Sequence, residues 1–346
     1  MKNKQRTVWI LRIIAAIVTI ASVVIFAPWQ AAYLYLKPLP DTVQQEVDNA
    51  IDYDLDGMVV YVGKKGQPPA FYTAGWKDRD KQIPADPQGL FKIASISKLY
   101  DAVAITKLVH NKRLSLDKTL ADYFPELIGR IDNADKITLK LMVQHRSGIP
   151  NFTDSPNYWQ HPAQSSQQAL ELILDLPANF KPDEDYEYSN TNYLLLSELI
   201  EKVTGLSKFQ YIKEKILIPL GLTHTFGSIH DVDMDDVISG YYVGIDEDIK
   251  TADYSSMLAT AEDVGRFLRA LNDGSVFDDP EEQAIYSSIY VYEHTGLVPG
   301  YQSFAKYHQD IDTVVVEFVN TTNFSGDTWI LSEVVFNRIG RILHEQ

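Results

Sequence analysis

The chain has 346 residues, and its formal net charge of −16 at pH 7 argues against a nucleic-acid binder that works through a basic surface. A hydrophobic share of 45%, with 11% aromatic residues, is too apolar for a disordered chain and predicts a folded core. The absence of Cys excludes disulfides, cysteine nucleophiles and Cys-ligated metal sites.

The first residues have the pattern of a membrane segment, and we assign residues 1–36 to it as a unit separate from the globular domain. An apolar run over 8–27 approaches the roughly 20 residues that span a bilayer, and it follows Lys2, Lys4 and Arg6. Because interfacial aromatic residues follow and no clear cleavage site does, we favour an uncleaved anchor over a cleaved secretory signal. The basic flank places the N-terminus in the cytoplasm and the domain in the periplasm or at the cell exterior, whereas cleavage would make the domain secreted.

A polar helix is expected over residues 41–51. Two strands follow over 57–63 and 70–74, and the turn-rich segment between them predicts an antiparallel pair. Residues 95–109 place apolar side chains on most sides of a helix, so we expect this helix to be buried. Further helices, separated by Gly and Pro, are predicted over residues 139–145, 166–176, 191–204, 209–218 and 262–271.

The last part of the chain returns to strand patterns. Strands are predicted over residues 289–293, 302–308 and 313–319, and a hairpin-length loop joins the last two. A helix from Trp329 to Leu343 closes the chain.

Strands at both ends with helices between them predict an α+β fold of the α/β sandwich type. One antiparallel sheet would be built from both chain ends and flanked by helices, with an inserted all-helical lobe. We expect one domain over residues 37–346. Its sheet lobe would take about 41–94 and 285–346, and its helical lobe about 95–284.

No metal or cofactor is expected from the motifs. The eight histidines are scattered, without the H-E-x-x-H or H-x-x-x-H spacing that places two ligands on one helix face. Asp52, Asp54 and Asp56 match the first half of a calcium loop, but the pattern of a strand follows them and the closing Glu is missing. Glycine-rich phosphate-binding motifs are also missing from the sequence.

A serine becomes a useful nucleophile when a nearby base takes its proton, and Ser-x-x-Lys on a helix places both groups on one face. The spacing occurs at Ser95–Lys98, Ser115–Lys118 and Ser303–Lys306. On the strand predicted around Ser303, an offset of three residues sends the two side chains to opposite faces. Ser115 is expected to open a short, solvated helix as an ordinary N-cap. Ser95 begins the buried helix, where desolvation would lower the lysine pKa from about 10.4 towards the range of a general base.

Two further motifs follow in the order that completes such a site. They are Tyr188-Ser189-Asn190 and His294-Thr295-Gly296. With them the chain resembles the serine β-lactamase and penicillin-binding protein family, in the branch of class C β-lactamases, D,D-carboxypeptidases and related esterases. The resemblance covers nearly all of residues 41–346, and its other landmarks are residues 114–125, 144–150, 188–194, 221–222 and 259–264.

The resemblance implies a β-lactamase/transpeptidase-like fold, an acyl-enzyme mechanism and no cofactor. Ser95 would be the acylated nucleophile, while Lys98 and Tyr188 would share the roles of base and acid. Asn190 would orient the substrate and the lysine. Taken singly, Asn190 could instead cap the following helix, and Tyr188 could be a packing aromatic residue.

The strand that carries His294, Thr295 and Gly296 would complete the site. By resemblance, the backbone N–H groups of Ser95 and Leu297 would form the oxyanion hole. An extended substrate could pair with this strand and so align its scissile carbonyl. Taken singly, His294 could be no more than a histidine at a strand end.

Three departures from the pattern bear on the substrate. His294 stands where β-lactamases of this branch usually carry Lys, and a mostly neutral imidazole should hold a substrate carboxylate less firmly. Leu297 replaces a residue that often offers a hydroxyl, and Phe152 stands where a glutamine is usual. We therefore predict hydrolysis of an ester or of a D-Ala-type peptide amide.

Two alternatives remain to this prediction. One is a β-lactamase, although the departures make efficient β-lactam turnover unexpected. The other is a non-catalytic, membrane-tethered relative that holds a peptidoglycan stem peptide. In every case the expected partners are a small-molecule or peptide substrate and the membrane, with no nucleic acid.

Overall fold

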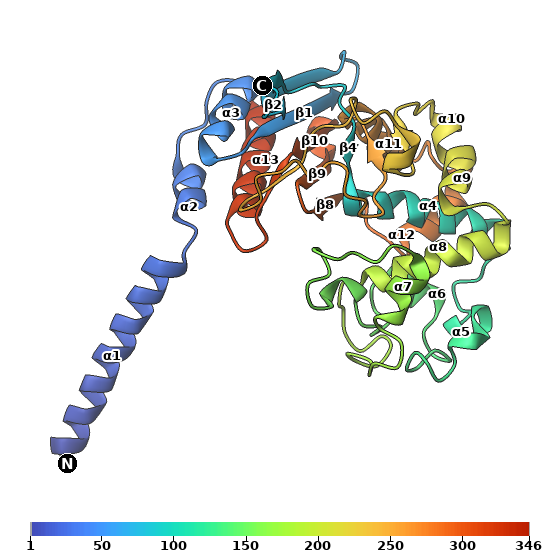
Figure 1. The fold of residues 1–346 in the computed structure, drawn as a ribbon, viewed down its shortest axis with the longest axis horizontal. Coiled ribbons are helices and arrows are strands. Elements are labelled where there is room, and N and C mark those ends of the chain that lie inside the picture. The colour runs from blue at the N-terminus through green and yellow to red at the C-terminus, as the bar shows by residue number, and fades with distance from the viewer. Residues whose placement is uncertain (1, 346) are drawn as a thin grey trace.

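A computed structural model describes residues 2–345, and a six-stranded antiparallel sheet forms the centre of its fold (Figure 1). The strand order is β3–β2–β1–β10–β9–β8, so strands from both chain ends meet in the pair of β1 and β10. The strands are β1 (Gly57–Lys64), β2 (Ala70–Asp78), β3 (Ile83–Pro84), β8 (His294–Val298), β9 (Tyr301–His308) and β10 (Thr313–Val319). The predicted α+β fold with one sheet built from both ends is confirmed.

The two central strands are buried on both faces because helices cover each side of the sheet. Successive side chains of a strand point to opposite faces, so Val60 and Val62 join one hydrophobic core while Val59 and Tyr61 join the other. The first core packs against α3 (Val43–Ala50) and α13 (Thr328–Glu345). The second packs against α11 (Ala261–Asp273) and continues into the helical lobe.

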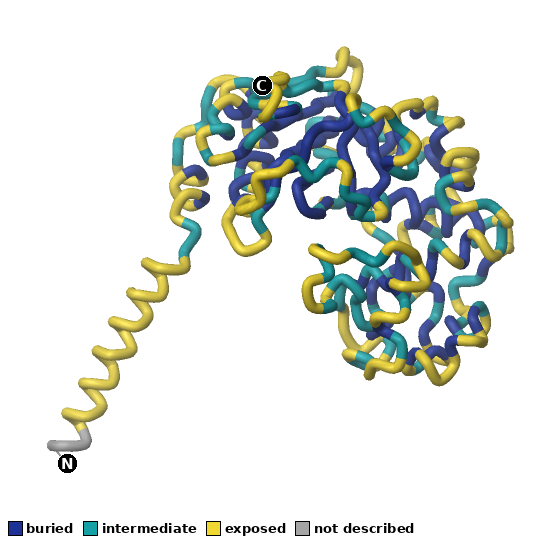
Figure 2. The backbone as a smooth tube through the Cα atoms, in the orientation of Figure 1, coloured by how far each residue is buried: buried dark blue, intermediate teal, exposed yellow. Residues whose placement is uncertain are grey.

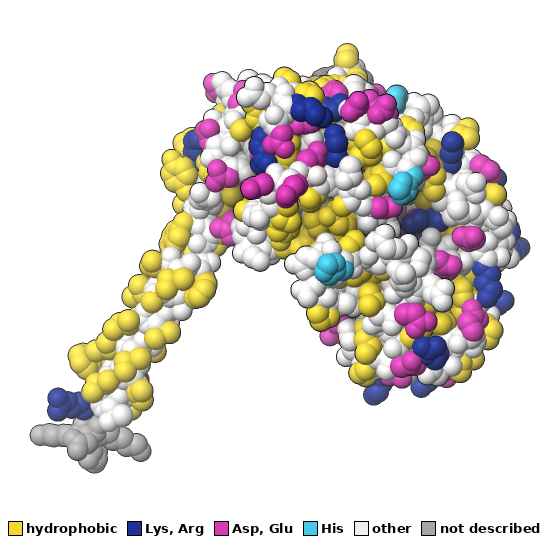
Figure 3. Space-filling view, in the orientation of Figure 1, with side chains coloured by type: hydrophobic (Ala, Val, Ile, Leu, Met, Phe, Trp, Pro, Cys, Tyr) yellow, Lys and Arg dark blue, Asp and Glu magenta, His cyan; other side chains and the backbone are white. Residues whose placement is uncertain are grey.

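The N-terminal helix α1 (Lys2–Phe26) extends away from the globule (Figures 1 and 2). Hydrophobic side chains cover most of its visible surface (Figure 3). Its stretch Gln5–Phe26 is long and apolar enough to cross a membrane, judged by length and composition. An N-terminal helix of this kind suits either a membrane anchor or a signal segment.

The short helix α2 (Trp29–Leu36) packs on the globule, although the sequence pattern assigns it to the membrane segment. Ala31 and Leu34 are buried in the core that α3 and α13 share. The pattern misses this contact because the apolar face of α2 suits a core as well as a membrane interface. The part of the predicted segment that extends free of the globule is therefore α1.

A buried ion pair fixes this N-terminal region to α13. The guanidinium of Arg338 donates to the carboxylate of Glu46 at 2.6 and 2.9 Å. It also donates to the carbonyl oxygens of Leu34, Lys37 and Pro38 at 2.6–3.0 Å. Since Arg338 is only 2% exposed, these acceptors replace the water that its charge loses. The same side chain thus joins α2, α3 and α13.

The helical lobe is built around α4 (Ser97–His110), whose residues 98–108 are all buried. The helices that surround it mostly begin after an N-cap Ser or Thr. They are α5 (Leu120–Tyr123), α6 (Leu139–Val143), α7 (Ser166–Glu171), α8 (Asn190–Thr204), α9 (Lys208–Ile212), α10 (Ile218–Leu220) and α12 (Pro280–Ser287). A single π-helical turn, Lys213–Leu217, joins α9 to α10. The predicted helices are present, but α7 ends at Glu171 instead of residue 176.

The strand predicted over residues 289–293 is wrong. This segment follows α12 as a turn and irregular chain, and β8 begins only at His294. Its alternating pattern arises because Tyr290 and Tyr292 pack against the core without strand pairing. Ser115 likewise lies in a turn and opens no helix.

Two small sheets have no counterpart in the sequence prediction. One consists of β4 (Phe91–Lys92), β7 (Leu258–Ala259) and β5 (Thr225–Phe226), in that order. The other pairs β11 (Thr321–Thr322) with β6 (Tyr241–Tyr242). Strands of two residues are too short to show a period. The first sheet matters for the site, because β4 leads directly to Ser95.

Candidate active site

A cleft of about 730 Å³ contains nearly all of the site residues predicted from sequence. The predicted residues on its lining are Ser95, Lys98, Phe152, Tyr188, Asn190, His294, Thr295 and Leu297. They come from the start of α4, the start of α8, the strand β8 and the loop around residue 152. The remaining predicted residue, Gly296, lies in β8 between two lining residues.

Ser95 stands on a sharp turn between β4 and α4. The preceding residue, Ala94, has φ of +48°, a left-handed conformation that residues with a Cβ adopt at some cost in energy. The backbone N–H of Ala94 donates to the Ser256 hydroxyl at 2.9 Å, which helps to hold the turn. Ser95 then lies in the 3₁₀ turn Ala94–Ile96 that runs into α4, so its hydroxyl is near the positive end of the helix dipole.

Lys98 is buried beside the serine, with 6% of its surface exposed. Its Nζ donates to Ser95 Oγ at 3.1 Å and to Asn190 Oδ1 at 2.9 Å. The same nitrogen lies 5.1 Å from the ring centre of Tyr188 and 5.3 Å from that of Tyr193. Aromatic faces at this distance favour a cation.

Tyr188 also contacts the serine. Its hydroxyl donates to Ser95 Oγ at 2.7 Å, so Oγ lies within hydrogen-bond distance of two groups that can carry a proton. The Tyr188 ring stacks on the ring of His145 with centroids 4.4 Å apart. Tyr188 therefore makes a hydrogen bond to Ser95 in addition to packing against His145.

His145 is a residue of this site that the sequence motifs did not single out. Its Nδ1 accepts the backbone N–H of Ser189 at 3.1 Å, and it has a left-handed φ of +57°. Burial lowers the pKa of His145 to about 3, and the nearby Lys98 charge adds to the effect, so the ring is neutral at pH 7. In the sequence, residues 144–150 are marked only as one of the segments that resemble the family. The contact with Tyr188 depends on that segment meeting the start of α8.

Asn190 uses its side chain inside the cleft. Its Nδ2 donates to Thr153 Oγ1 at 3.2 Å, and this contact turns Oδ1 towards Lys98. Its backbone N–H donates to Asn151 Oδ1 at 3.0 Å. Asn190 is the first residue of α8 while Ser189 is the N-cap, so the side chain serves the cleft and not the helix end.

The strand β8 lies directly against the turn that carries Ser95, and Gly296 makes this approach possible. A Cβ at Gly296 would lie 2.3 Å from the carbonyl oxygen of Ile93, which no side chain can accommodate. β8 is also the last strand in the order of the sheet. An edge strand keeps backbone N–H and C=O groups that an extended peptide can pair with.

His294 is half-buried at the start of β8 and faces two tyrosines. Its ring stacks on Tyr290 at 6.0 Å and lies 6.3 Å from the ring of Tyr188. Burial lowers the pKa of His294 to about 4, so the imidazole is neutral at pH 7. These contacts place His294 inside the aromatic surroundings of the cleft.

A chain of aromatic rings forms the wall of the cleft around Phe152. Phe152 meets Tyr158 at 5.3 Å, Tyr158 meets Trp159 at 5.2 Å, and Trp159 meets Tyr254 at 5.9 Å. All four residues line the cleft. Only Phe152 could be predicted, because the others lie in segments without a periodic pattern. This wall gives the cleft an apolar part beside its polar cluster.

Solved structures of other proteins share the fold of this chain. A D-amino acid amidase from Ochrobactrum anthropi superposes with a TM-score of 0.77 at 20% identity, covering 88% of this chain and 97% of that chain. A penicillin-binding protein from Bacillus halodurans gives a TM-score of 0.69 at 20% identity, covering 85% and 98%. At these identities the likeness shows the fold.

Sequence comparisons identify the family. Protein flp of Staphylococcus aureus is 31% identical over 193 residues, which are 54% of this chain and 39% of that protein. The match thus spans well under half the length of this curated relative. A sequence model of the Beta-lactamase family matches residues 39–289, which is more than two thirds of the chain. The chain therefore belongs to the Beta-lactamase family of serine hydrolases.

Proposed function

We propose that this protein hydrolyses an amide or ester through an acyl-enzyme on Ser95. The observation that carries the proposal is the pair of contacts to Ser95 Oγ, at 2.7 Å from the Tyr188 hydroxyl and 3.1 Å from Lys98 Nζ. Acylation and deacylation each need groups that take up and give back a proton, and two such groups lie within reach of Ser95 Oγ. The membership of the Beta-lactamase family supports the same chemistry.

The proposed reaction has two balanced steps. In acylation, Ser95 Oγ attacks the substrate carbonyl carbon, and its proton passes either to Lys98 as a neutral amine or to Tyr188 as a phenolate. The bond to the amine or alcohol then breaks, and the leaving group takes up a proton from the same pair. In deacylation, water attacks the ester on Ser95, again giving its proton to the pair, and Oγ leaves with a proton as the acid product forms.

Lys98 and Tyr188 share proton transfer in this proposal. Asn190 Oδ1 accepts a hydrogen bond from Lys98 Nζ, and the fixed direction of the amide keeps Nζ pointed at Ser95. His145 supports the ring of Tyr188 from behind and is therefore a positioning residue. Either residue could be the one that first takes the serine proton.

The β8 edge would position the substrate. In this proposal the backbone of Thr295 and Leu297 pairs with the substrate chain, and the N–H groups of Ser95 and Leu297 bind the oxyanion. Because the pKa of His294 lies near 4, position 294 carries no fixed cation for a substrate carboxylate at pH 7. A substrate without a carboxylate next to the scissile bond fits this surface best.

The aromatic wall favours an apolar acyl group. Phe152, Tyr158, Trp159 and Tyr254 would surround a side chain next to the scissile carbonyl. The amidase from Ochrobactrum anthropi with the same fold was crystallised with L-phenylalanine amide and with D-phenylalanine. We therefore propose amides of D-amino acids, D-Ala-type peptide amides and short esters as the substrate class, ahead of β-lactams.

We also propose that α1 anchors the protein in the cytoplasmic membrane with the cleft on the extracytoplasmic side. The apolar stretch Gln5–Phe26 and the basic residues before it support this orientation. A peptidoglycan stem peptide would be within reach of the enzyme there.

A substrate panel tests the proposed function. The full chain in detergent should hydrolyse D-phenylalanine amide, a D-Ala-D-Ala peptide and a short nitrophenyl ester, with cephalosporin hydrolysis the slowest. The Ser95→Ala variant should hydrolyse none of them above background. Faster turnover of the cephalosporin would favour a β-lactamase, and binding of the peptide without any turnover would favour the non-catalytic relative.

A further inference from the structure

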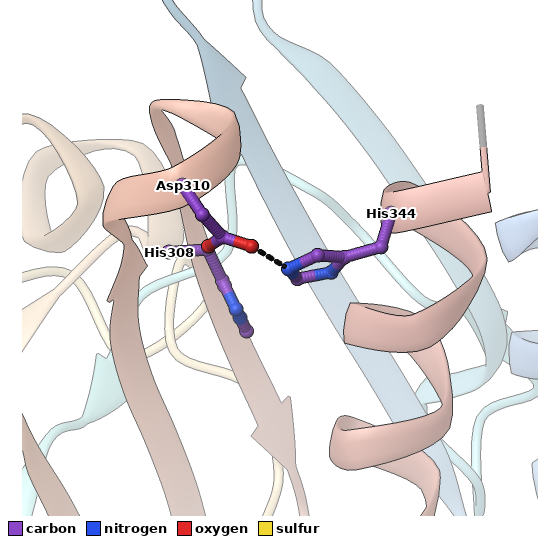
Figure 4. Close-up of side chains that lie close together, drawn as sticks. All are labelled: His308, Asp310 and His344. Carbon is purple, nitrogen blue, oxygen red and sulfur yellow. Dashed lines mark hydrogen bonds and ion pairs between the residues drawn. The ribbon is translucent and has the colours of Figure 1, made fainter.

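A second cluster of chemically active side chains lies outside the catalytic cleft. His308 ends β9, Asp310 lies in the turn Gln309–Ile311 that follows, and His344 lies in the last turn of α13 (Figure 4). Each side chain offers one ligand atom, and these atoms all lie within 4.8 Å of one another. We propose that the cluster is a binding site for a Zn²⁺ ion, or a similar divalent transition metal ion, between the hairpin and the C-terminal helix.

His308 provides an imidazole nitrogen without another use. Its Nε2 is buried and has no hydrogen-bond partner among the described residues. Buried polar atoms nearly always have a partner, so an unpaired ring nitrogen calls for an explanation. One ring nitrogen of His308 lies within 4.8 Å of the ligand atoms of Asp310 and His344, so a metal ion at this place would bind the imidazole.

His344 is oriented as metal-binding histidines usually are. Its Nδ1 lies 2.6 Å from the carbonyl oxygen of Gly340, and because a carbonyl only accepts, Nδ1 must carry the proton. Nε2 of the neutral ring then holds the lone pair, and it faces Asp310 Oδ2 at 2.6 Å. An imidazole that donates from one nitrogen to a backbone carbonyl and turns the other towards a ligand site is the usual outer-shell arrangement.

Nε2 and a carboxylate oxygen both carry lone pairs, so a cation must join them. Without metal a proton does so, and His344 and Asp310 form an ion pair. A metal ion would replace that proton, release it to solvent and add His308 as a third ligand. The pair alone makes no use of His308, whereas the metal site uses all three residues.

Gly340 makes room for this arrangement. A Cβ at this position would lie 3.0 Å from His308 Cε1 and force the imidazole to move. Glycine is otherwise unfavourable inside a helix such as α13. The same residue also provides the carbonyl that orients His344. Both histidines therefore depend on Gly340.

The donor set selects the class of ion. Two imidazoles and one carboxylate suit Zn²⁺ with a water as the fourth ligand, whereas Ca²⁺ and Mg²⁺ prefer oxygen ligands. Since Asp310 and His344 are exposed, solvent can reach the fourth position. The sequence motifs did not predict a metal, because His308 and His344 are far apart in the chain and meet only when α13 packs beside β9.

Zinc titration of the tag-free full chain in detergent tests the proposal. Calorimetry should show one Zn²⁺ bound per chain, and Co²⁺ should give the visible absorption of a tetrahedral site. His308→Ala, Asp310→Asn and His344→Ala should each weaken Zn²⁺ binding at least about tenfold. The matched control is His230→Ala, since His230 also pairs with a single carboxylate, that of Asp253, but has no third ligand beside it.

The Gly340→Ala variant distinguishes a metal site from a simple ion pair between His344 and Asp310. This variant keeps all three ligand residues and displaces the His308 ring, so Zn²⁺ binding should weaken while the unfolding temperature without metal stays close to that of the wild type. Zinc should raise the unfolding temperature of the wild type by a few degrees and that of His308→Ala by less. Absence of stoichiometric binding, or equal binding by wild type and by a folded His308→Ala variant, would show an ion pair only and overturn the proposal.

Discussion

Two walls of the cleft around Ser95 are held in different ways. Around Ser95, hydrogen bonds of 2.7–3.1 Å join Ser95 and Tyr188, which lie just before α4 and α8, to each other and to residues in the first turns of those helices, and β8 lies against the turn before the serine. Around Trp159, ring contacts of 5.2–5.9 Å join residues from loops. Directed hydrogen bonds can hold a reacting geometry, whereas ring packing between loops tolerates different shapes. We therefore assign catalysis to the first wall and selectivity to the second, and substitutions in each wall can test that division.

Ser95→Ala should have the largest effect, because it removes the proposed nucleophile. We expect kcat to fall by at least about 10⁴-fold with the fold intact. Steady-state hydrolysis of the best substrate from the panel measures it. Ser115→Ala is the matched control, since Ser115 also precedes a lysine by three residues but lies in a turn, and full activity is expected of it. Appreciable turnover by Ser95→Ala would place the reaction elsewhere.

Tyr188→Phe should lower kcat by about 10²–10³-fold, since it removes one proton carrier and keeps the ring that stacks on His145. KM should change little, because the substrate is held mainly by β8 and the aromatic wall. The split between kcat and KM from full saturation curves is the measurement. A change confined to KM would mean that Tyr188 only binds substrate.

His145 should make stability depend on pH. Its pKa is about 3 in the folded protein and near 6.5 when unfolded, so between these values the unfolded chain binds more protons. The free energy of unfolding should therefore fall as the pH drops from 6.5 to 4, with His145 contributing on the order of 2–3 kcal/mol. Urea unfolding at both pH values should show a smaller drop in His145→Gln. An unchanged drop would contradict the buried neutral state.

Trp159→Ala should raise KM for D-phenylalanine amide about tenfold and leave kcat within about twofold. The physical reason is that Trp159 contributes apolar surface and no group that moves a proton. A D-Ala-type amide, which reaches less of the wall, should be affected less. Equal losses of kcat for both substrates would contradict the assignment of catalysis to one wall and selectivity to the other.

His294→Lys should have the smallest effect, shifting preference without abolishing activity. A fixed cation at position 294 should raise kcat/KM about fivefold for a D-Ala-D-Ala peptide, which carries a carboxylate, relative to the amide. Competition between the two substrates measures the ratio. A ratio that stays constant would show that position 294 does not face the substrate carboxylate.

The parts of the molecule that could be predicted are those with a local signal. Residues 313–319 form a strand as predicted, because a nearly continuous run of β-branched and other apolar side chains marks it. Residues 95–109 were correctly predicted as buried, because apolar side chains occur on most of the helix surface. Ser95, Lys98, Tyr188 and Asn190 could be proposed from short motifs, and the fold brings all four together.

The remaining features depend on contacts between distant segments. The stacking of His145 on Tyr188 and the position of Trp159 follow from how loops cross, which no period in the sequence records. α2 packs on the globule because Arg338, near the other end of the chain, supplies donors for its carbonyl groups. The contact between His308 and His344 is likewise formed by segments that are distant in the chain.

Covalent trapping of the acyl-enzyme tests the central claim most directly. The full chain would be treated with a fluorophosphonate or a penicillin, digested and examined by mass spectrometry. We predict one adduct per chain, located on Ser95, and no adduct in the Ser95→Ala variant. An adduct on another residue, or none with either probe while the protein hydrolyses its substrate, would contradict the account.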